Sequence, residues 1–273
     1  MKGIDVSTYQ GYPDWKKVKE DGVDFAILEA SQGRAESSES YLFRDSKFVY
    51  NITNATAAGI PCGVYHYFTA QTEAECDREA EFFLSVIEPY RDKITLYAAV
   101  DVESKYLMEM SKPTLTALVR RFCEAVERAG YEPIVYTNPD WLRNRLGDLS
   151  DYFLWLALWR SKHLKPVGYD NMEIWQWGAS KVNGIAGKVD TNIGFFDFST
   201  TTVPDTKPEP SHRDELRPGD PVRVENPIRY DTGKLFQPRF RQYTIDSIIN
   251  DRAVISHHGM GRTPVHIEYI EKI

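Results

Sequence analysis

Residues 96–103, LYAAVDVE, are an apolar run that ends in two acids, Asp101 and Glu103, separated by one residue. Such a run predicts a strand that is buried on both faces, as in a parallel sheet. Side chains alternate across a strand, so the two carboxyl groups are expected on the same side. A carboxylate at the end of a buried strand is costly unless it lies at an open edge. The stretch therefore predicts a parallel sheet with an acidic pair at its carboxyl edge.

Similar apolar runs recur on both sides of this stretch and alternate with helical patterns, which is typical of a parallel sheet wrapped by helices. The predicted strands are Gly3–Val6, Phe25–Ala30, Gly63–Phe68, Leu96–Val102, Ile134–Tyr136, Phe153–Leu158, Glu173–Trp177 and a short piece near Val189. The predicted helices are Lys16–Asp21, Phe48–Ala58, Glu73–Ile87, Pro113–Ala129 and Asp140–Leu146. About eight strands, with helices that thin out late in the chain, predict an α/β fold: a (β/α)8-like barrel with incomplete helical cover.

A change of composition divides the chain into domains. Residues 200–215, TTTVPDTKPEPSHRDE, contain three prolines and four acids but little apolar surface, so we expect an extended linker there. The barrel is accordingly assigned to residues 1–199. Residues 216–273 contain short β-rich runs separated by turn signals such as Asp231-Thr232-Gly233. This spacing predicts a small all-β SH3-like barrel.

Composition narrows the classes of partner. The chain has 273 residues and a formal net charge of −7, which argues against a nucleic-acid partner. No run approaches the roughly 18 apolar residues of a membrane span, and the first residues lack a signal-peptide pattern. We therefore expect no membrane anchor and synthesis in the cytoplasm without an export signal. Cys62, Cys76 and Cys123 lack the paired spacings of metal sites and disulfide frameworks, so they are expected to be free and buried. No metal or cofactor is expected.

Acids at strand ends are the candidate catalytic groups. Two like charges held close together raise each other's pKa, which can keep one group protonated near neutral pH. One acid and one base are what glycoside cleavage requires, and Asp101 with Glu103 can supply them. The alternative is a solvated pair, or an ion pair with Lys105. Asp5 and Asp190 also lie at predicted strand ends, although each alone is more typical of a helix N-cap or a turn than of a catalytic group.

Aromatic residues are frequent at the same strand ends. Sugars stack on aromatic faces, so these rings fit a glycan cleft, although many of them must fill the core instead. Rings spaced two apart on one strand, Tyr65 with Tyr67 and Trp175 with Trp177, are expected to face the cleft. His66 lies between the two tyrosines on the opposite face and is interpreted as a hydrogen-bonded core residue.

Five segments, taken in order, resemble the glycoside hydrolase family 25 lysozymes, also called Chalaropsis-type muramidases, over residues 1–198. They are GIDVSTYQG at 3–11 with Asp14-Trp15, AGIPCGVYHYF at 58–68, AVDVE at 99–103, YEPIVYTN at 131–138, and WQWG with GIAGKVDTN at 175–192. The segments Arg217–Val224 and Asp251–Ile255 are similar to the bacterial SH3-type modules found at the ends of phage endolysins.

The resemblance implies hydrolysis of the β-1,4 bond between N-acetylmuramic acid and N-acetylglucosamine in peptidoglycan. Glu103 would be the general acid and Asp101 its partner, while Asp5 and Asp190 would complete the acidic cleft. Direct attack by Asp101 and assistance by the substrate's acetamido group are both open, and we favour the assisted route with retention. The implied substrate-binding residues are Tyr65, Tyr67, Tyr136, Trp159, Trp175, Trp177, Asn192 and Gln32.

The resemblance has one departure, because Glu29 and Gln32 stand where the family usually has a lysine and a glutamate. Gln32 forms hydrogen bonds but cannot ionise. We expect activity to survive, since the four strand-end acids are present. The alternatives are a catalytically silent peptidoglycan-binding protein and a glycosidase that acts on another N-acetylglucosamine polymer.

The two-module plan and the lack of a signal-peptide pattern together favour a phage or prophage endolysin. Such a protein would be made in the host cytoplasm and reach the Gram-positive cell wall through a membrane lesion. Residues 216–273 would bind the wall.

Overall fold

A computed structural model describes residues 1–34, 41–159, 166–195, 216–224, 243–249, 252–257, 260–267 and 270–272. The chain divides into two compact units. The larger unit comprises Met1–Leu149 and Phe153–Phe196, and the smaller unit contains the C-terminal strands. The predicted linker at 200–215 lies outside the described residues, so its boundaries stay a prediction.

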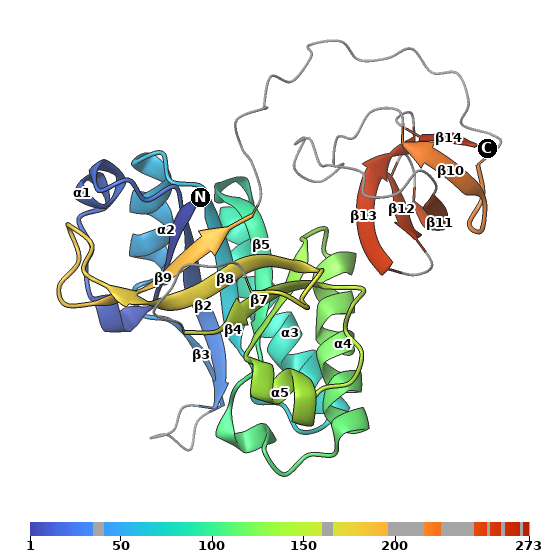
Figure 1. Cartoon of the computed structure of the whole chain (residues 1–273), viewed down its shortest axis with the longest axis horizontal. Coiled ribbons are helices and arrows are strands. Elements are labelled where there is room, and N and C mark those ends of the chain that lie inside the picture. The colour runs from blue at the N-terminus through green and yellow to red at the C-terminus, as the bar shows by residue number, and fades with distance from the viewer. Residues whose placement is uncertain are drawn as a thin grey trace. The chain divides into compact units, whose positions relative to one another are not determined.

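The larger unit is built on a closed barrel of eight strands (Figure 1). These strands are β1 (Lys2–Val6), β2 (Phe25–Arg34), β4 (Cys62–Tyr67), β5 (Ile94–Asp101), β6 (Pro133–Thr137), β7 (Phe153–Ala157), β8 (Met172–Ser180) and β9 (Val189–Gly194). All neighbouring pairs from β1 to β8 are parallel, and β9 closes the barrel antiparallel to both β8 and β1. The predicted α/β barrel is therefore confirmed, and β3 (Tyr41–Arg44) is added at the edge of β2.

The antiparallel last strand has a simple cause. Only residues 181–188 separate β8 from β9, and a parallel crossover needs about a dozen residues or more. The chain can therefore only turn back along its neighbour. As a result β9 pairs with β1 in a register that places Asp190 opposite Asp5.

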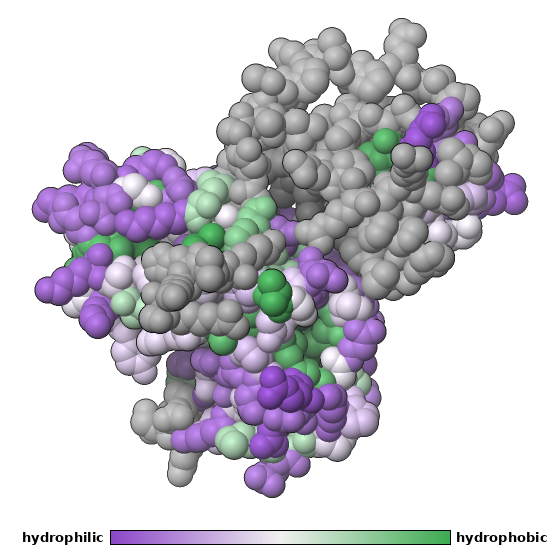
Figure 2. Space-filling model, viewed as in Figure 1, coloured by the Kyte–Doolittle hydropathy of each residue, from purple (hydrophilic) through white to green (hydrophobic). Residues whose placement is uncertain are grey.

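Helices cover the barrel mainly along its first half. They are α1 (Trp15–Glu20), α2 (Phe48–Ala57), α3 (Glu73–Ile87), α4 (Lys112–Arg128) and α5 (Pro139–Asn144), with 3-10 turns η1 (Thr8–Gln10), η2 (Glu88–Lys93) and η3 (Lys105–Leu107). Local sequence starts the long helices, because Thr72 and Ser111 each accept a hydrogen bond from a backbone N–H of the first turn. The face of this unit seen in Figure 2 is largely hydrophilic, as expected where helices turn polar sides outward.

The outer side of the barrel wall contains a buried polar network. His66 is fully buried, as predicted, and its Nδ1 lies 2.8 Å from Ser31 Oγ. Its Nε2 lies 2.9 Å from Glu79 Oε2 on α3. The backbone N–H and the hydroxyl of Thr69 and the hydroxyl of Tyr41 also donate to the Glu79 carboxylate. The network therefore joins β2, β3 and β4 to α3. The three cysteines are buried and free, as expected.

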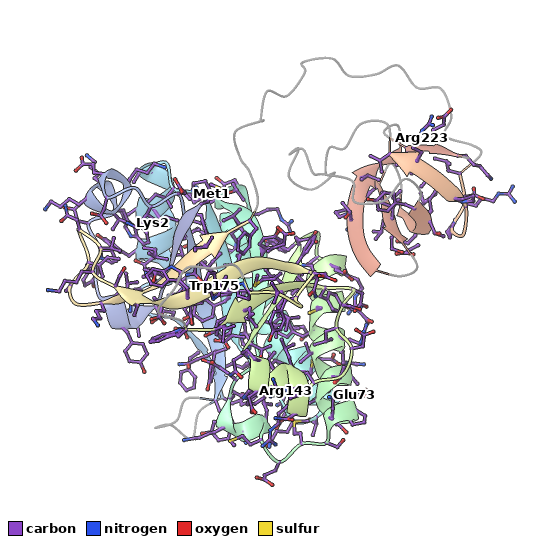
Figure 3. The ribbon with its side chains drawn as sticks, viewed as in Figure 1. Met1, Lys2, Glu73, Arg143, Trp175 and Arg223 are labelled. Carbon is purple, nitrogen blue, oxygen red and sulfur yellow. The ribbon has the colours of Figure 1, made fainter. Side chains whose placement is uncertain are left out.

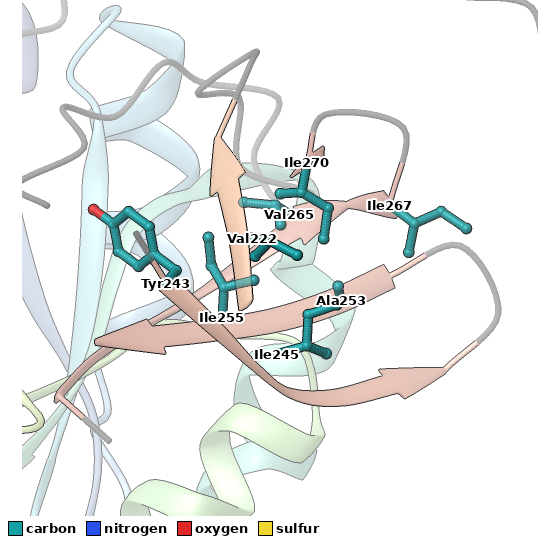
Figure 4. Packing of buried hydrophobic residues seen from close by; sticks show 8 residues of the cluster. All are labelled: Val222, Tyr243, Ile245, Ala253, Ile255, Val265, Ile267 and Ile270. Atoms are coloured by element: carbon teal, nitrogen blue, oxygen red, sulfur yellow. The ribbon is translucent and has the colours of Figure 1, made fainter. Parts of the chain in front are cut away.

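The smaller unit is a five-stranded antiparallel sheet with the strand order β13-β12-β11-β10-β14. Its strands are β10 (Pro221–Val224), β11 (Tyr243–Ile249), β12 (Arg252–His257), β13 (Met260–His266) and β14 (Ile270–Lys272). Buried side chains from these strands and from Ile267 form one small apolar cluster (Figure 4). The turn expected at 231–233 lies outside the described residues, and the SH3-like topology stays a prediction.

Candidate active site

One pocket gathers the four acids that the sequence singled out. It is lined by Asp5, Ser7, Tyr9, Gln10, Tyr65, Asp101, Glu103, Tyr136, Trp155, Gln176 and Asp190. Asp101 is the last residue of β5, and Glu103 follows two residues later. Asp5 lies in β1 and Asp190 lies directly opposite it in β9. The pocket therefore lies at the mouth of the barrel where the parallel strands end, as in other barrels of this class.

Asp101 is the acid of this pocket whose carboxyl group is buried without a full set of hydrogen bonds. Its residue is only 6% exposed, and its Oδ1 has no hydrogen-bond partner among the described residues. Burial raises the pKa of Asp101 well above its ordinary value, and the charges of Glu103 and Glu29 raise it further. A carboxyl group in this position is a strong proton acceptor whenever it is ionised.

Glu103 is exposed to solvent, so a ligand can reach it. Its pKa is nevertheless raised, first because the pocket walls desolvate the carboxyl group and second because Asp190 lies nearby. A hydrogen bond with Tyr136 works in the opposite direction. The pKa of Asp190 is also raised by burial. Glu103 thus combines access to a ligand with a tendency to stay protonated, which a general acid needs.

Asp5 is held in place by two amide side chains. Asn192 Nδ2 donates to Asp5 Oδ2 at 2.7 Å, and Gln176 Nε2 lies 3.2 Å from the same oxygen. Burial and the charge of Asp190 raise the pKa of Asp5 to about 7, although both amides lower it. Asn192 also accepts the indole N–H of Trp155 at 2.7 Å. Because Asn192 is fully buried and donates to Asp5, it is placed to position that carboxyl group, and its expected contact with substrate stays a prediction.

The expected orientation of Trp175 on β8 is wrong. Trp175 is fully buried in a cluster with Leu154, Leu156 and Met172, and its indole N–H donates to the Leu158 carbonyl at 2.7 Å. It lies within the larger unit in Figure 3. Trp177 packs against the same cluster. Trp175 therefore cannot serve as the expected sugar-stacking surface. Trp177 is only partly buried, and its role in binding stays a prediction.

Gln176, between the two tryptophans, faces the pocket instead. Its Oε1 accepts hydrogen bonds from the Tyr136 hydroxyl at 3.2 Å and from Trp159 Nε1 at 3.0 Å. Both faces of β8 are covered, so its sequence has no polar–apolar alternation to show which side faces inward. The one available signal is the polar residue between two tryptophans.

The remaining predicted aromatic residues fall into two groups. Tyr65 and Tyr136 line the pocket, and Trp159 is 59% exposed beside it through its bond to Gln176. Their roles in binding stay predictions. Tyr67 and Gln32 are paired neighbours in β4 and β2 and are not among the lining residues.

Sequence reasoning missed the turn after β1. Ser7 and Gln10 form a capping box around η1, in which Gln10 Oε1 accepts the Ser7 N–H at 2.9 Å. Both residues line the pocket together with Tyr9. Ser7 is therefore the N-cap of this turn, and Asp5 is left free for the pocket. The S-x-x-Q spacing after the first strand was the available signal.

Glu29 lies just behind the pocket. It is 8% exposed and accepts the Tyr65 hydroxyl at 3.3 Å. Burial, with the charge of Asp45, raises the pKa of Glu29 to about 8. The residue that departs from the family pattern is therefore neutral at pH 7, and it supports a ring of the pocket wall.

No group of three or more His, Cys, Asp or Glu side chains among the described residues is arranged to hold a metal ion. No helix in the same part of the chain has the length and apolar character needed to cross a membrane.

The chain is similar to proteins of known activity. A family model described as "Glycosyl hydrolases family 25" matches residues 4–185. Lysozyme M1 of Streptomyces globisporus is 29% identical over 204 residues, which cover 70% of this chain and 67% of that protein. An N,O-diacetylmuramidase of Chalaropsis sp is 25% identical over 208 residues, which cover 70% of this chain and 96% of that protein.

A solved structure of the CTP1L endolysin is similar to the chain with a TM-score of 0.58 at 25% identity, and the match covers 71% of this chain and 66% of that chain. The family model spans most of the barrel, including Asp5, Asp101 and Glu103. The chain therefore belongs to family 25 of the glycosyl hydrolases, and it is a glycoside hydrolase.

Proposed function

We propose that this enzyme is a muramidase that hydrolyses the β-1,4 bond between N-acetylmuramic acid and N-acetylglucosamine in peptidoglycan. The observation that carries the proposal is the pairing of an accessible Glu103, with a raised pKa, and a buried Asp101 in one pocket. The similarity to a lysozyme and to an N,O-diacetylmuramidase supports this choice of substrate.

Glu103 is the general acid in this proposal. Its protonated carboxyl group donates to the oxygen of the leaving sugar while the glycosidic bond breaks. The acetamido carbonyl of the muramic acid attacks the anomeric carbon from the opposite side and forms an oxazolinium ion. Glu103, now a carboxylate, takes a proton from the water that attacks the anomeric carbon and opens the oxazolinium ring. The anomeric carbon is inverted twice, so the product keeps its configuration.

Asp101 steadies the acetamido group in this route. Its carboxyl group lines the pocket, where it would accept the acetamido N–H. The raised pKa makes it a better acceptor as that N–H becomes acidic in the oxazolinium ion. Asp5 and Asp190 add negative charge beside the developing positive charge.

The purified chain should clear a suspension of susceptible Gram-positive cells, and Glu103→Gln should not. Mass spectrometry of the soluble fragments should find muramic acid at the reducing ends. Equal clearing by both proteins would remove Glu103 from its assigned role. Binding without release of any fragment would favour a silent binding protein, and fragments with only N-acetylglucosamine ends would favour another substrate.

We further infer that the chain is a phage or prophage endolysin. It would be made in the host cytoplasm and act on the wall after release through a membrane lesion. The similarity to an endolysin supports this inference, as does the separate C-terminal β unit, which would hold the Gram-positive wall.

The C-terminal role can be tested with labelled Glu103→Gln protein. It should decorate susceptible cells, and a chain that ends at residue 199 should decorate them much less. Equal decoration by both would exclude residues 216–273 as the wall-binding module.

A further inference from the structure

Tyr9 is an exposed aromatic ring beside the acidic pocket. The residue is 89% exposed, although it contributes to the pocket wall. Tyr12, three residues later, is 68% exposed, but its ring contacts Tyr50 edge-on at 4.9 Å and carries the Lys47 ammonium 3.8 Å from its centre. Within the described residues Tyr9 has no such ring or cation neighbour. Tyr12 is thus engaged by its own fold, and Tyr9 is not.

The backbone that carries Tyr9 is fixed by hydrogen bonds. The capping box joins Ser7 and Gln10 on either side of the turn. From the loop before α2, Asp45 Oδ2 accepts the Thr8 N–H at 2.7 Å, and Ser46 Oγ lies 2.8 Å from Thr8 Oγ1. Asp45 itself is only 7% exposed and also accepts the Lys47 N–H. A turn held from two sides keeps its side chain at a constant place.

A rigid turn that presents a bare ring is what a stacking surface requires. The turn is already ordered when the protein folds. Binding of a ligand to the ring therefore costs little additional conformational entropy of the protein. Tyrosine also offers a large apolar face with few torsions to freeze. The neighbouring lining groups are carboxyl, amide and hydroxyl groups, which match the polar edges of a sugar ring.

We propose that Tyr9 is a sugar-stacking residue that binds an N-acetylated amino sugar of the glycan strand at the edge of the acidic pocket. The inference rests on the proposed muramidase function and adds a binding residue to the same cleft. Trp159 follows β7, is 59% exposed and donates a hydrogen bond to the pocket residue Gln176. It gives the cleft a second exposed ring.

Binding to soluble strand fragments tests this proposal. Full-length Glu103→Gln protein would be titrated by calorimetry with tetra- and hexasaccharides of alternating N-acetylglucosamine and N-acetylmuramic acid. Adding Tyr9→Ala should raise the Kd by roughly three- to tenfold, which is the size expected for one lost stacking contact. Tyr9→Phe keeps the ring and should bind within about twofold of the parent. Tyr12→Ala is the matched control and should leave the Kd unchanged.

The outcomes separate this inference from the function on which it rests. If the parent binds the fragments and Tyr9→Ala binds them equally well, Tyr9 is not a stacking residue. If Tyr9→Phe loses as much affinity as Tyr9→Ala, the hydroxyl group and not the ring makes the contact, and the proposal fails. If the parent binds no fragment and the wild-type chain cleaves none, the muramidase proposal fails and this inference falls with it.

Discussion

Two buried carboxyl groups on opposite sides of the same barrel wall have opposite electrostatic states. Glu79, on the outer side, is fully buried and accepts hydrogen bonds from Tyr41, Thr69 and His66, and its pKa is lowered although burial alone would raise it. Asp101, at the inner mouth, is almost as buried, has an oxygen without a partner, and has a raised pKa.

The difference shows that burial does not by itself make a carboxylate reactive. Where donors satisfy every oxygen, the charged form is favoured and the group stabilises the fold. Where donors are withheld and other acids are close, the charged form is disfavoured and the group can take or give a proton. The outer network joins strands to a helix, and the inner cluster is available for chemistry. This comparison leads to the following predictions, ordered by the size of the effect.

Asp101→Asn should lose activity by roughly 10²- to 10³-fold, because an amide accepts the acetamido N–H poorly and cannot ionise. The same variant should be as stable as the parent or more stable, by about 1 kcal/mol, because a buried charge that lacks a partner is removed. Cell-wall hydrolysis rates and urea unfolding would measure the two effects. A variant that unfolds more readily than the parent would place Asp101 in the same class as Glu79.

Glu79→Ala should lower the free energy of unfolding by about 3 kcal/mol, because it leaves the donors of Tyr41, Thr69 and His66 unsatisfied in the core. Glu81→Ala, at an exposed position of the same helix, is the control and should change stability by less than about 0.5 kcal/mol. Urea denaturation followed by circular dichroism would compare them. Similar small changes in both variants would show that the network adds nothing to stability.

The two classes of acid should respond to pH in opposite directions. The pKa of Asp5 is raised from 3.8 to about 7, so the folded state holds its proton more tightly than the unfolded state. Stability contributed by this proton is present at low pH and is lost as pH rises towards 7. Glu79 has a lowered pKa, so it instead contributes stability at pH values above 4.5, its ordinary pKa. This stability is lost as the pH falls below that value.

Asp5→Asn should therefore gain stability relative to the parent between pH 4 and pH 7, by about 1 kcal/mol given that Asp5 is half-buried. Unfolding curves recorded across this range would show the gain. A constant difference between the two proteins would mean that Asp5 titrates at its ordinary pKa in the folded state.

The smallest effect is expected at Glu29. Since its pKa is about 8, the group is neutral at pH 7, and Glu29→Gln replaces one neutral acceptor of the Tyr65 hydroxyl by another. Hydrolysis at pH 7 should stay within about twofold of the parent. A large loss of activity at pH 7 would show that Glu29 acts as a charged group.

Sequence reasoning reached the barrel and its acids because both depend on strand ends. Apolar runs that stop at Asp5 and at Asp101 define the carboxyl edge without any knowledge of tertiary contacts. The antiparallel direction of β9 was missed, although the short connection after β8 carried that signal.

The rest could not be predicted, because it depends on packing. The orientation of Trp175 and Gln176 is set by a strand covered on both faces, where pattern gives no direction. The partners of Glu79 come from β3, from β4 and from the loop after β4, and sequence pattern alone does not bring them together. Asn192 appeared as a possible ligand contact, and only its burial beneath Asp5 shows that it is placed to position another residue.

Dependence on the leaving group tests the role of Glu103 most directly. On cell walls, where the departing sugar oxygen needs a proton, Glu103→Gln should be slower by roughly 10³-fold. On an aryl glycoside whose phenolate leaves without a proton, the same variant should keep its rate for bond cleavage within about tenfold of the wild type. An equally large loss on both substrates would contradict the assignment of Glu103 as the general acid.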